Sequence, residues 1–313
     1  MTFPDAPPPS NPPQAEWIQR PERSNRTMLQ VMTWISLRLG RQPARFVLGG
    51  ISLYFLLFSP AAKAASRIYL RRVLGREVRR ADLFRHFHSF ASTIHDRLFL
   101  LNGRHDLFEV EVHGNTVIDA VLASGRGAFL MGAHMGSFEV ARAIGRQQGL
   151  KVAMVMYEDN ARKLNDALAA INPAAVMEII PLGQLDSMLR VKDRLDSGGA
   201  LGMLGDRTLS GEPTVRLPFL GEEAEFPLGP MRLAAMLKRP VLFMSGLYLG
   251  GNRYALHFEP LADFSDLERT GRDAAIRTAV EAYAARLEQH CRAAPYNWFN
   301  FYDFWRPRDA APP

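Results

Sequence analysis

The sequence has almost no cysteine, and this limits the chemistry that the chain can carry. Cys291 is the single cysteine among 313 residues. An internal disulfide framework is therefore excluded, and so is a zinc site made of cysteines alone. The scarcity of cysteine also fits a reducing, cytoplasmic setting.

Signature motifs of three large enzyme classes are missing as well. The sequence contains no glycine–lysine pair, no G-x-S-x-G turn and no H-E-x-x-H helix. These absences remove P-loop nucleotide hydrolases, serine esterases with a nucleophile elbow and the common zinc proteases. Enzyme classes that lack such a signature motif are still possible.

The chain also lacks a large excess of charge of one sign. Lys plus Arg number 38 against 32 for Asp plus Glu, which gives a net charge of +6. This mild excess suits an anionic membrane surface or an acidic partner, and it is lower than we expect for a nucleic-acid binder. Hydrophobic residues make up 47% of the chain, as in ordinary globular proteins.

The composition divides the chain into four parts. Residues 1–23 are rich in proline and residues 307–313 resemble them, so both are predicted to be disordered tails. The first tail has no charged segment leading into an apolar one, so we do not read it as a signal peptide. Residues 24–106 are predicted to be helical and membrane-associated, and residues 107–306 to form an α/β domain.

An uncharged stretch at residues 46–62 supports membrane association of the helical region. Its length is at the lower limit for crossing a bilayer. Basic residues flank it on both sides, which favours a helix that lies in or dips into the interface over a single crossing. A buried core helix is the alternative, and the sequence leaves spanning open.

A basic stretch follows, with seven arginines between Arg67 and Arg85. It can pair with lipid phosphates or an acidic carrier protein, or it can form a solvated helix face. His86 and His88 lie in the same helical pattern, but residues two apart do not share a helix face, so no metal site is expected there.

Residues 107–306 alternate between strand and helix patterns. Strands are expected at 108–112, 128–131, 151–156, 176–180, 200–204, 241–249 and 254–258, and helices at 116–124, from 137, at 161–171, 185–195, 230–238 and 272–292. Such units predict an α/β fold with a mainly parallel mixed sheet flanked by helices. Residues 205–229 are expected to be mostly loop.

The turn between the strand at 128–131 and the next helix is the main candidate for a functional site. It carries His134, while Glu139 lies in the first turn of the helix. If His134 is still in the turn, its ring can fold back to meet the Glu139 carboxylate, which would make the ring a general base. The alternative is a turn histidine bonded to backbone and a solvated glutamate. Gly136 and Ser137, in the same turn, are expected to contact substrate.

Other candidates follow later strands. Asp206 and Arg207 come directly after the strand at 200–204, where Arg207 could hold a phosphate or polarise a carbonyl and Asp206 could orient Arg207 or His134. An ordinary loop ion pair is the alternative. Arg162 follows the strand at 151–156 and could face the same pocket or solvent. The apolar stretches at 217–221 and 225–230 could line an acyl chain or simply pack as a loop.

The order of motifs resembles a known superfamily over residues 24–306. G-A-F-L-M-G-A-H-M-G-S-F-E, G-M-L-G-D-R, L-P-F-L-G, F-P-L-G and P-Y-N-W-F are similar to motifs of lysophospholipid acyltransferases, with bacterial lipid A late acyltransferases as the nearest branch. The resemblance implies that His134 deprotonates an acceptor hydroxyl, which attacks an acyl thioester, and that Glu139 orients His134. Lipid A enzymes usually have Asp-Gln at the position of Asp206-Arg207, and an arginine where this chain has Glu158. The Arg207 departure puts the lipid A acceptor in doubt, though not acyl transfer, and the Glu158 departure puts in doubt that Arg162 takes the role of the missing arginine.

The resulting hypothesis is a membrane-associated O-acyltransferase on the cytoplasmic face of a bacterial inner membrane. Its co-substrate would be a thioester of acyl-carrier protein or coenzyme A, its acceptor a lipid or glycolipid hydroxyl, and it would use no metal, cofactor or nucleic acid. Oxyanion stabilisation would come from turn amides near Gly136 or from Arg207. The alternatives are a non-catalytic lipid-binding or scaffold protein of the same fold and a hydrolase of acyl thioesters.

Overall fold

A computed structural model describes residues 34, 36–147, 152–173, 178–184, 186–208 and 211–306. The predicted tails at 1–23 and 307–313 lie outside the described residues, as do residues 24–33 and 35 of the predicted helical region. The first residues of the strand predicted at 176–180 also lie outside them.

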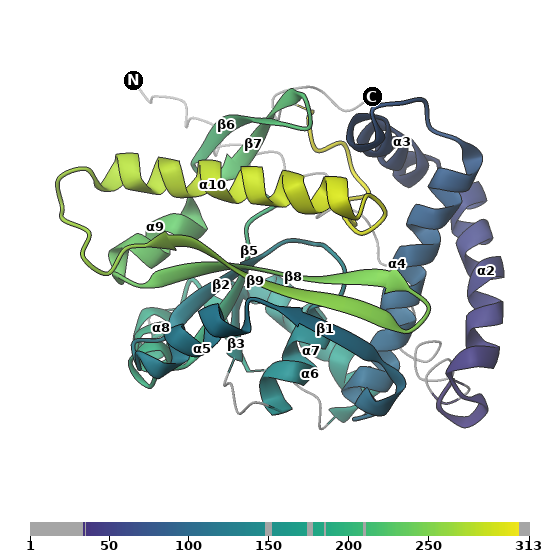
Figure 1. Cartoon of the computed structure of the whole chain (residues 1–313), viewed down its shortest axis with the longest axis horizontal. Helices are drawn as coiled ribbons and strands as arrows, with labels where there is room; N and C mark the ends of the chain where they lie inside the picture. The colour runs from purple at the N-terminus through teal and green to yellow at the C-terminus, as the bar shows by residue number, and fades with distance from the viewer. Residues whose placement is uncertain are drawn as a thin grey trace, which may run out of the picture.

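A seven-stranded mixed sheet forms the centre of the α/β part (Figure 1). Its order is β1-β9-β8-β2-β5-β3-β4, and all neighbouring pairs are parallel except β8 and β9. The strands are β1 (Glu109–His113), β2 (Ala128–Gly132), β3 (Val152–Tyr157), β4 (Ile179–Leu182), β5 (Ala200–Leu204), β8 (Pro240–Gly250) and β9 (Arg253–Asp263). This confirms the predicted mainly parallel mixed sheet.

Helices cover both faces of this sheet (Figure 1). They are α5 (Asn115–Ala123), α6 (Phe138–Gln147), α7 (Glu158–Ile171), α8 (Ser187–Asp196), α9 (Gly229–Met236) and α10 (Arg272–Ala293). Helices α9 and α10 pack on one face, while α5, α6 and α7 pack on the other. Alternate residues of each strand point to opposite faces, so both faces need apolar side chains, and the inner strands β2, β3 and β5 are correspondingly apolar.

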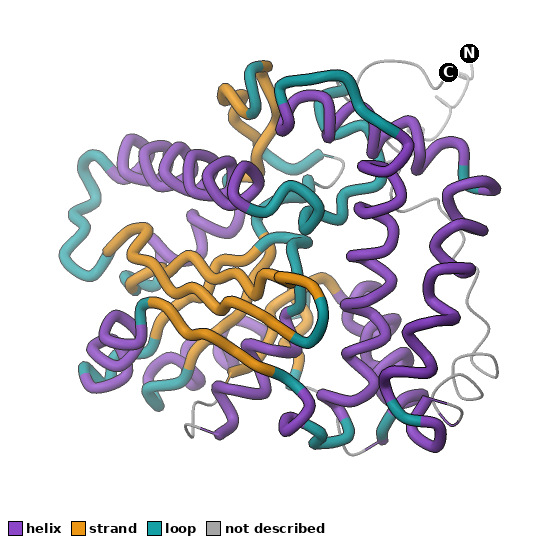
Figure 2. Tube along the Cα trace, turned by 45° about the vertical axis from the view of Figure 1, so that its right-hand side comes forward, coloured by secondary structure: helices purple, strands orange, loops and turns teal. Residues whose placement is uncertain are grey.

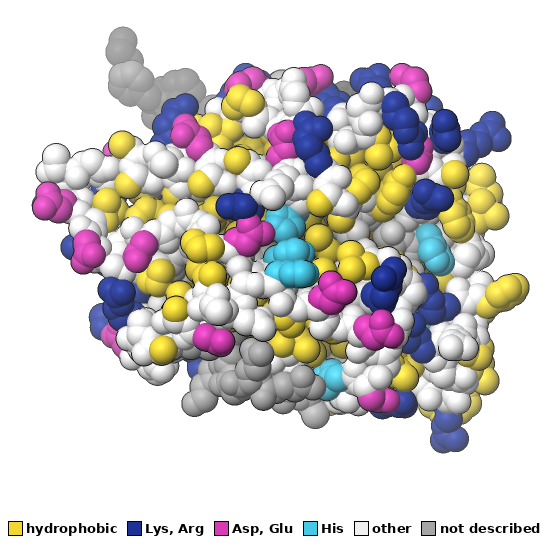
Figure 3. All heavy atoms as spheres, viewed as in Figure 1, with side chains coloured by type: hydrophobic (Ala, Val, Ile, Leu, Met, Phe, Trp, Pro, Cys, Tyr) yellow, Lys and Arg dark blue, Asp and Glu magenta, His cyan; other side chains and the backbone are white. Residues whose placement is uncertain are grey.

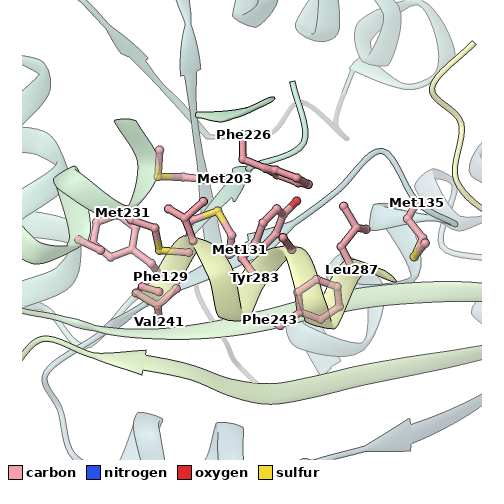
Figure 4. Packing of buried hydrophobic residues seen from close by; sticks show 14 of the residues in the cluster. Phe129, Met131, Met135, Met203, Phe226, Met231, Val241, Phe243, Tyr283 and Leu287 are labelled. Atoms are coloured by element: carbon pink, nitrogen blue, oxygen red, sulfur yellow. The ribbon is translucent and has the colours of Figure 1, made fainter. Parts of the chain in front are cut away.

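The main core lies between the sheet and α10 (Figure 4). Phe129 and Met131 of β2 point to this side together with Phe243 of β8, and they meet Tyr283 and Leu287 of α10. The Tyr283 hydroxyl donates to the Gly132 carbonyl at 2.9 Å, so this buried polar group is satisfied. The core therefore holds the end of β2 in place from one side.

A hairpin occupies most of the region that we predicted to be loop. Strands β6 (Thr214–Phe219) and β7 (Glu222–Pro227) pair antiparallel as a separate two-stranded sheet. The prediction was wrong because Pro218 and Gly221 look like loop residues. A two-stranded ribbon has only edges, where proline is tolerated, and Gly221 supplies a positive φ of 90° at the turn.

The N-terminal helices stand as a layer beside the α/β part (Figure 2). They are α2 (Arg41–Phe58), α3 (Pro60–Leu74) and α4 (Arg80–Leu101), followed by the short 3-10 helix η1 (His105–Leu107). Arg41 of α2 makes a bidentate pair with the buried Asp96 of α4, at 2.7 and 2.8 Å. Tyr254 of β9 donates to the same carboxylate at 2.7 Å, so one buried carboxylate ties both helices to the sheet.

The uncharged segment at 46–62 is divided between two helices. Helix α2 ends at Phe58, and α3 starts at Pro60 after a bend of 96°. Among the described residues, no single helix is long and apolar enough to cross a bilayer, and only this bent pair reaches the required length and composition. Proline at the first position of α3 explains the break, because proline cannot continue the preceding helix but starts a new one well.

Candidate active site

The register of two parallel strands brings His134 and Asp206 together. Strands β2 and β5 are neighbours, and Gly132 lies directly opposite Leu204 at their carboxyl ends. His134 and Asp206 each come two residues later, so both enter the same edge of the sheet. This edge is where α/β proteins usually form their sites.

Asp206 is fully buried and accepts four hydrogen bonds. His134 donates through its ring Nδ1 to Oδ1 at 2.8 Å and through its backbone N–H to Oδ2 at 2.9 Å. Trp298 Nε1 and Asn300 Nδ2 donate to Oδ2 at 2.8 and 2.9 Å. A carboxylate with this many donors is stabilised in its ionised form.

The electrostatics of the pair favour a neutral imidazole beside an ionised carboxylate. Burial would raise the pKa of Asp206, but the His134 ring, the Arg207 charge and the hydrogen bonds outweigh it and lower that pKa to about 2. The pKa of His134 is also below its ordinary value, because burial and the Arg207 charge outweigh the opposing effect of Asp206. With Nδ1–H bound to Asp206, the lone pair lies on Nε2, which is the arrangement of a general base. The His134 side chain is 27% exposed, so the ring is still accessible from outside.

Glu139 does not contact His134, and this part of the prediction was wrong. Its Oε1 forms an ion pair with Arg97 of α4 at 2.6 Å, and its Oε2 accepts from Ser137 Oγ at 3.1 Å. Glu139 is only 7% exposed, so it is not a solvated helix residue, and both of its carboxylate oxygens bind groups other than His134. Its position in α6 directs it to the N-terminal helical layer, away from the edge that holds Asp206.

The turn amides near Gly136 are already bonded, contrary to the expectation that they stabilise an oxyanion. Gly136 N–H donates to Asn297 O at 2.9 Å, and Ser137 N–H donates to Gly246 O at 2.8 Å. Gly136 has φ +60°, and a Cβ on it would lie 1.9 Å from Gly246 O, so only glycine fits between the turn and β8. Gly136 and the buried Ser137 therefore pack the turn against Gly246 of β8.

Arg207 lies at the site, whereas Arg162 is not part of the Asp206 network. Arg207 Nε donates to Asn300 Oδ1 at 2.9 Å, and its guanidinium lies 5.8 Å from the centre of the Tyr302 ring. Arg207 is therefore held on the residue that also binds Asp206. Arg162 lies on α7 with an exposed side chain, and Asp206 makes no contact with it.

The C-terminal segment Asn297–Asn300 supplies hydrogen-bond donors to Asp206 that the sequence interpretation missed. Phe299 N–H donates to His134 O at 2.7 Å, and Met135 pairs with Trp298, so the segment runs alongside the His134 turn. The fully buried Trp298 covers part of the core. Two asparagines flank two aromatic residues in Asn297–Asn300, and this was the available signal, because buried amides need polar partners.

A possible metal site lies apart from the His134–Asp206 pair. Among the described residues, one group of three possible ligands lies close enough to share an ion, and it consists of His257, Glu259 and His290. It includes neither His134 nor Asp206. His86, for which no metal role was expected, contacts Ser66 Oγ and Trp298 O, at 2.7 and 2.8 Å.

Comparison with known proteins identifies one family. The model of the family described as bacterial lipid A biosynthesis acyltransferase matches residues 20–307, which is nearly the whole chain. No curated protein matches the sequence.

Proposed function

The chain belongs to the bacterial lipid A biosynthesis acyltransferase family, and from this premise we propose that it transfers an acyl group from a thioester to a lipid hydroxyl with His134 as general base. The observation that carries the proposal is the contact between His134 Nδ1 and the buried Asp206. We assign to Asp206 the orienting role that the resemblance implied for Glu139.

The proposed reaction starts with removal of a proton from the acceptor hydroxyl by His134 Nε2. The oxygen attacks the thioester carbonyl carbon and forms a tetrahedral intermediate. When the intermediate collapses, the C–S bond breaks, and the leaving thiolate takes the proton from the imidazolium. The ester and the free thiol are the products, and the imidazole is neutral again.

Asp206 supports this cycle in two ways. It holds the tautomer that leaves the lone pair on Nε2, and its negative charge stabilises the imidazolium that forms in the middle of the reaction. Trp298 and Asn300 fix the carboxylate by donating to its second oxygen. They are positioning residues, since they act through Asp206.

Arg207 is our candidate for the group that stabilises negative charge on the intermediate. Burial lowers the pKa of the His134 ring most, and the charge of Arg207 lowers it further. The amides of Gly136 and Ser137 are engaged by backbone carbonyls, which leaves the guanidinium better suited than these amides.

The exposed side of α2 supports attachment to a membrane. Phe46 is 91% exposed, and other large apolar side chains follow it at helical spacing, namely Val47, Leu53, Tyr54, Leu57 and Phe58. The opposite side of α2 packs on α4 through Leu48 and Ser52. In Figure 3 the edge that corresponds to α2 in Figure 1 carries yellow apolar and dark blue basic side chains together. Such a surface suits an interface of anionic lipid, so we propose that α2 lies in the membrane surface near the acceptor.

The donor that we propose is an acyl thioester of carrier protein or coenzyme A, and the acceptor is a lipid or glycolipid hydroxyl. No metal or cofactor takes part in these steps. The cytoplasmic face of a bacterial inner membrane is the corresponding location, because such thioesters are made in the cytoplasm.

The decisive experiment uses acyl-carrier protein loaded with a labelled acyl chain and bacterial lipid extract. We expect label to move to lipid with the wild-type protein and transfer to be abolished in His134→Ala. His113→Ala, which changes an exposed histidine on β1, is the matched control and should keep wild-type turnover. Circular dichroism would confirm that both variants are folded.

Other outcomes separate the alternative functions. Label released as free acid without entering lipid would indicate a thioester hydrolase. Binding of lipid with no movement of label in the wild-type protein, with either thioester donor, would indicate a non-catalytic lipid-binding protein. Wild-type turnover in His134→Ala would contradict the proposed base.

A further inference from the structure

A second cluster of functional groups lies between β9 and α10. Strand register places Ser245 of β8 and His113 of β1 directly opposite His257 of β9, so the three share one face of the sheet. Glu259 is two residues further along β9 and therefore points to the same face. His290 of α10, which covers this face, contacts Ser245.

The side chains of His257, Glu259 and His290 converge. One ligand atom from each lies within 4.8 Å of the other two. His290 Nε2 is 2.6 Å from Glu259 Oε1, and the rings of His257 and His290 meet edge to face with centroids 4.9 Å apart. His257 and Glu259 are half-buried and His290 is buried, so the cluster reaches the surface. Figure 3 shows cyan histidine side chains beside a magenta acidic one near the middle of the visible face.

Outer hydrogen bonds hold two of the three groups in place. Ser245 Oγ lies 3.2 Å from His290 Nδ1, on the side of the ring away from Glu259. Arg286, one turn before His290 on α10, binds the other carboxylate oxygen of Glu259 at 2.6 Å. Metal ligands in proteins usually have such partners, which fix the histidine tautomer and the direction of the carboxylate.

We propose that His257, Glu259 and His290 form a binding site for a divalent first-row transition metal ion, with Zn²⁺ as its best-fitting occupant.

The ligand chemistry determines this choice of ion. Two imidazoles and one carboxylate suit Zn²⁺ and its neighbours, whereas Mg²⁺ and Ca²⁺ prefer oxygen ligands alone. Two ligands on a tetrahedral zinc ion lie roughly 3.4 Å apart. His290 Nε2 and Glu259 Oε1, which are 2.6 Å apart, must therefore separate by about 0.8 Å, and His257 must approach. Water would complete the coordination.

Besides these movements, metal binding at this site requires a change of tautomer in His290. Without the ion, Nε2–H donates to Glu259 and Nδ1 accepts from the Ser245 hydroxyl. With the ion bound, the Nε2 lone pair points to the metal, and the proton lies on Nδ1, where Ser245 Oγ accepts it. The ion would join α10 to β9 and so stabilise the layer that covers the main core.

The sequence interpretation missed this site because its members are separated along the chain. The H-x-E pattern at 257–259 was the available signal, since residues two apart on a strand share a face. The third ligand comes from a helix 31 residues later.

The test measures metal binding rather than transfer activity. Untagged protein is stripped with a chelator and dialysed against Zn²⁺, and bound zinc is counted by elemental analysis. A parallel titration with Co²⁺ follows the visible absorption of the bound ion. We expect one ion per chain and a thermal unfolding midpoint that rises when Zn²⁺ is added.

Four variants make the assignment specific. His257→Ala and Glu259→Gln should each weaken binding by at least roughly 100-fold, because loss of a ligand costs more than loss of an outer partner. His134→Ala and His105→Ala should bind as the wild type does. Unfolding midpoints without metal report whether the first two variants are folded, and His257 makes only ring contacts, so its removal should be tolerated.

The competing explanation is that His290 and Glu259 form only a hydrogen-bonded pair that supports the fold. Wild-type protein that binds Zn²⁺ no better than His257→Ala would establish this and overturn the proposal. Loss of binding in His113→Ala with a folded chain would also overturn it, since the ion would then belong to the stacked pair of His113 and His257.

Discussion

His134 donates its ring Nδ1–H to Asp206 across 72 residues of sequence, because both follow directly opposed residues of neighbouring parallel strands by the same two positions. The contact is therefore set by the pairing of two strands in the sheet. Sites built on strand ends are positioned more accurately than those built on long loops.

Asp206→Asn should abolish most of the transfer activity while leaving a folded protein. An asparagine cannot accept all four hydrogen bonds, and its amide would favour the tautomer with the proton on Nε2. We expect turnover to fall by about 10³–10⁴-fold, as in other histidine–aspartate pairs. Steady-state kinetics with labelled thioester would measure it, and a loss under tenfold would contradict the orienting role.

Glu139→Gln should act mainly on stability, because Glu139 binds Arg97 and Ser137 rather than His134. Loss of one partner of a largely buried ion pair leaves a poorly compensated charge, and Arg97 is 26% exposed, so we expect a cost of about 1–3 kcal/mol in the free energy of unfolding. Urea denaturation measures this cost. Arg97→Met combined with Glu139→Gln should recover part of it, and the exposed pair Arg277–Glu281 offers Arg277→Met as a control with little effect.

The pH dependence of transfer should reflect the lowered pKa of His134. The base must be neutral, so kcat/KM should stay level through neutral pH and decline only as pH falls below the ordinary histidine value of about 6.5. Arg207 contributes to the lowering, so Arg207→Gln should raise the pKa of His134 and shift this acid limb to higher pH. An unchanged or downward shift in Arg207→Gln would show that its charge does not act on the ring.

Gly136→Ala should be much more damaging than a similar change elsewhere. A Cβ at Gly136 would lie 1.9 Å from Gly246 O, and the residue has φ +60°. Gly75 provides a matched control, because its φ is +62° and no atom lies within 4 Å of its added Cβ. We expect Gly75→Ala to cost about 1 kcal/mol and Gly136→Ala at least about 3 kcal/mol in unfolding free energy, together with most of the activity. Equal costs in thermal or urea unfolding would mean that the turn can move away from β8.

Membrane binding should depend on the exposed side of α2. Phe46→Glu combined with Phe58→Glu replaces two exposed apolar residues, each worth about 1.5–3 kcal/mol when buried, so partitioning into anionic vesicles should weaken by at least about 100-fold. Leu189→Glu combined with Met236→Glu changes equally apolar exposed residues on α8 and α9. Vesicle co-sedimentation should separate the two double variants, and equal losses would place the membrane contact elsewhere.

Local patterns in the sequence were sufficient to predict most strands and helices of the α/β part and to select His134 as a candidate functional residue. Apolar runs closed by glycine indicated β2 and β5, and the histidine in a tight turn at a strand end indicated a site. The hairpin of β6 and β7 was missed, since proline and glycine give the same local signal in a loop and in an edge ribbon.

The partner of His134 was decided only by tertiary structure. Closeness in sequence favoured Glu139, but helix α6 directs that residue towards Arg97 of α4. Strand pairing between β2 and β5 brings Asp206 to the ring instead, and the C-terminal segment adds Trp298 and Asn300. The sequence by itself determined which residues form strands, helices and the histidine turn, because those depend on neighbours along the chain. Only the packed sheet decided which carboxylate meets the imidazole, because strand order and register depend on contacts between distant segments.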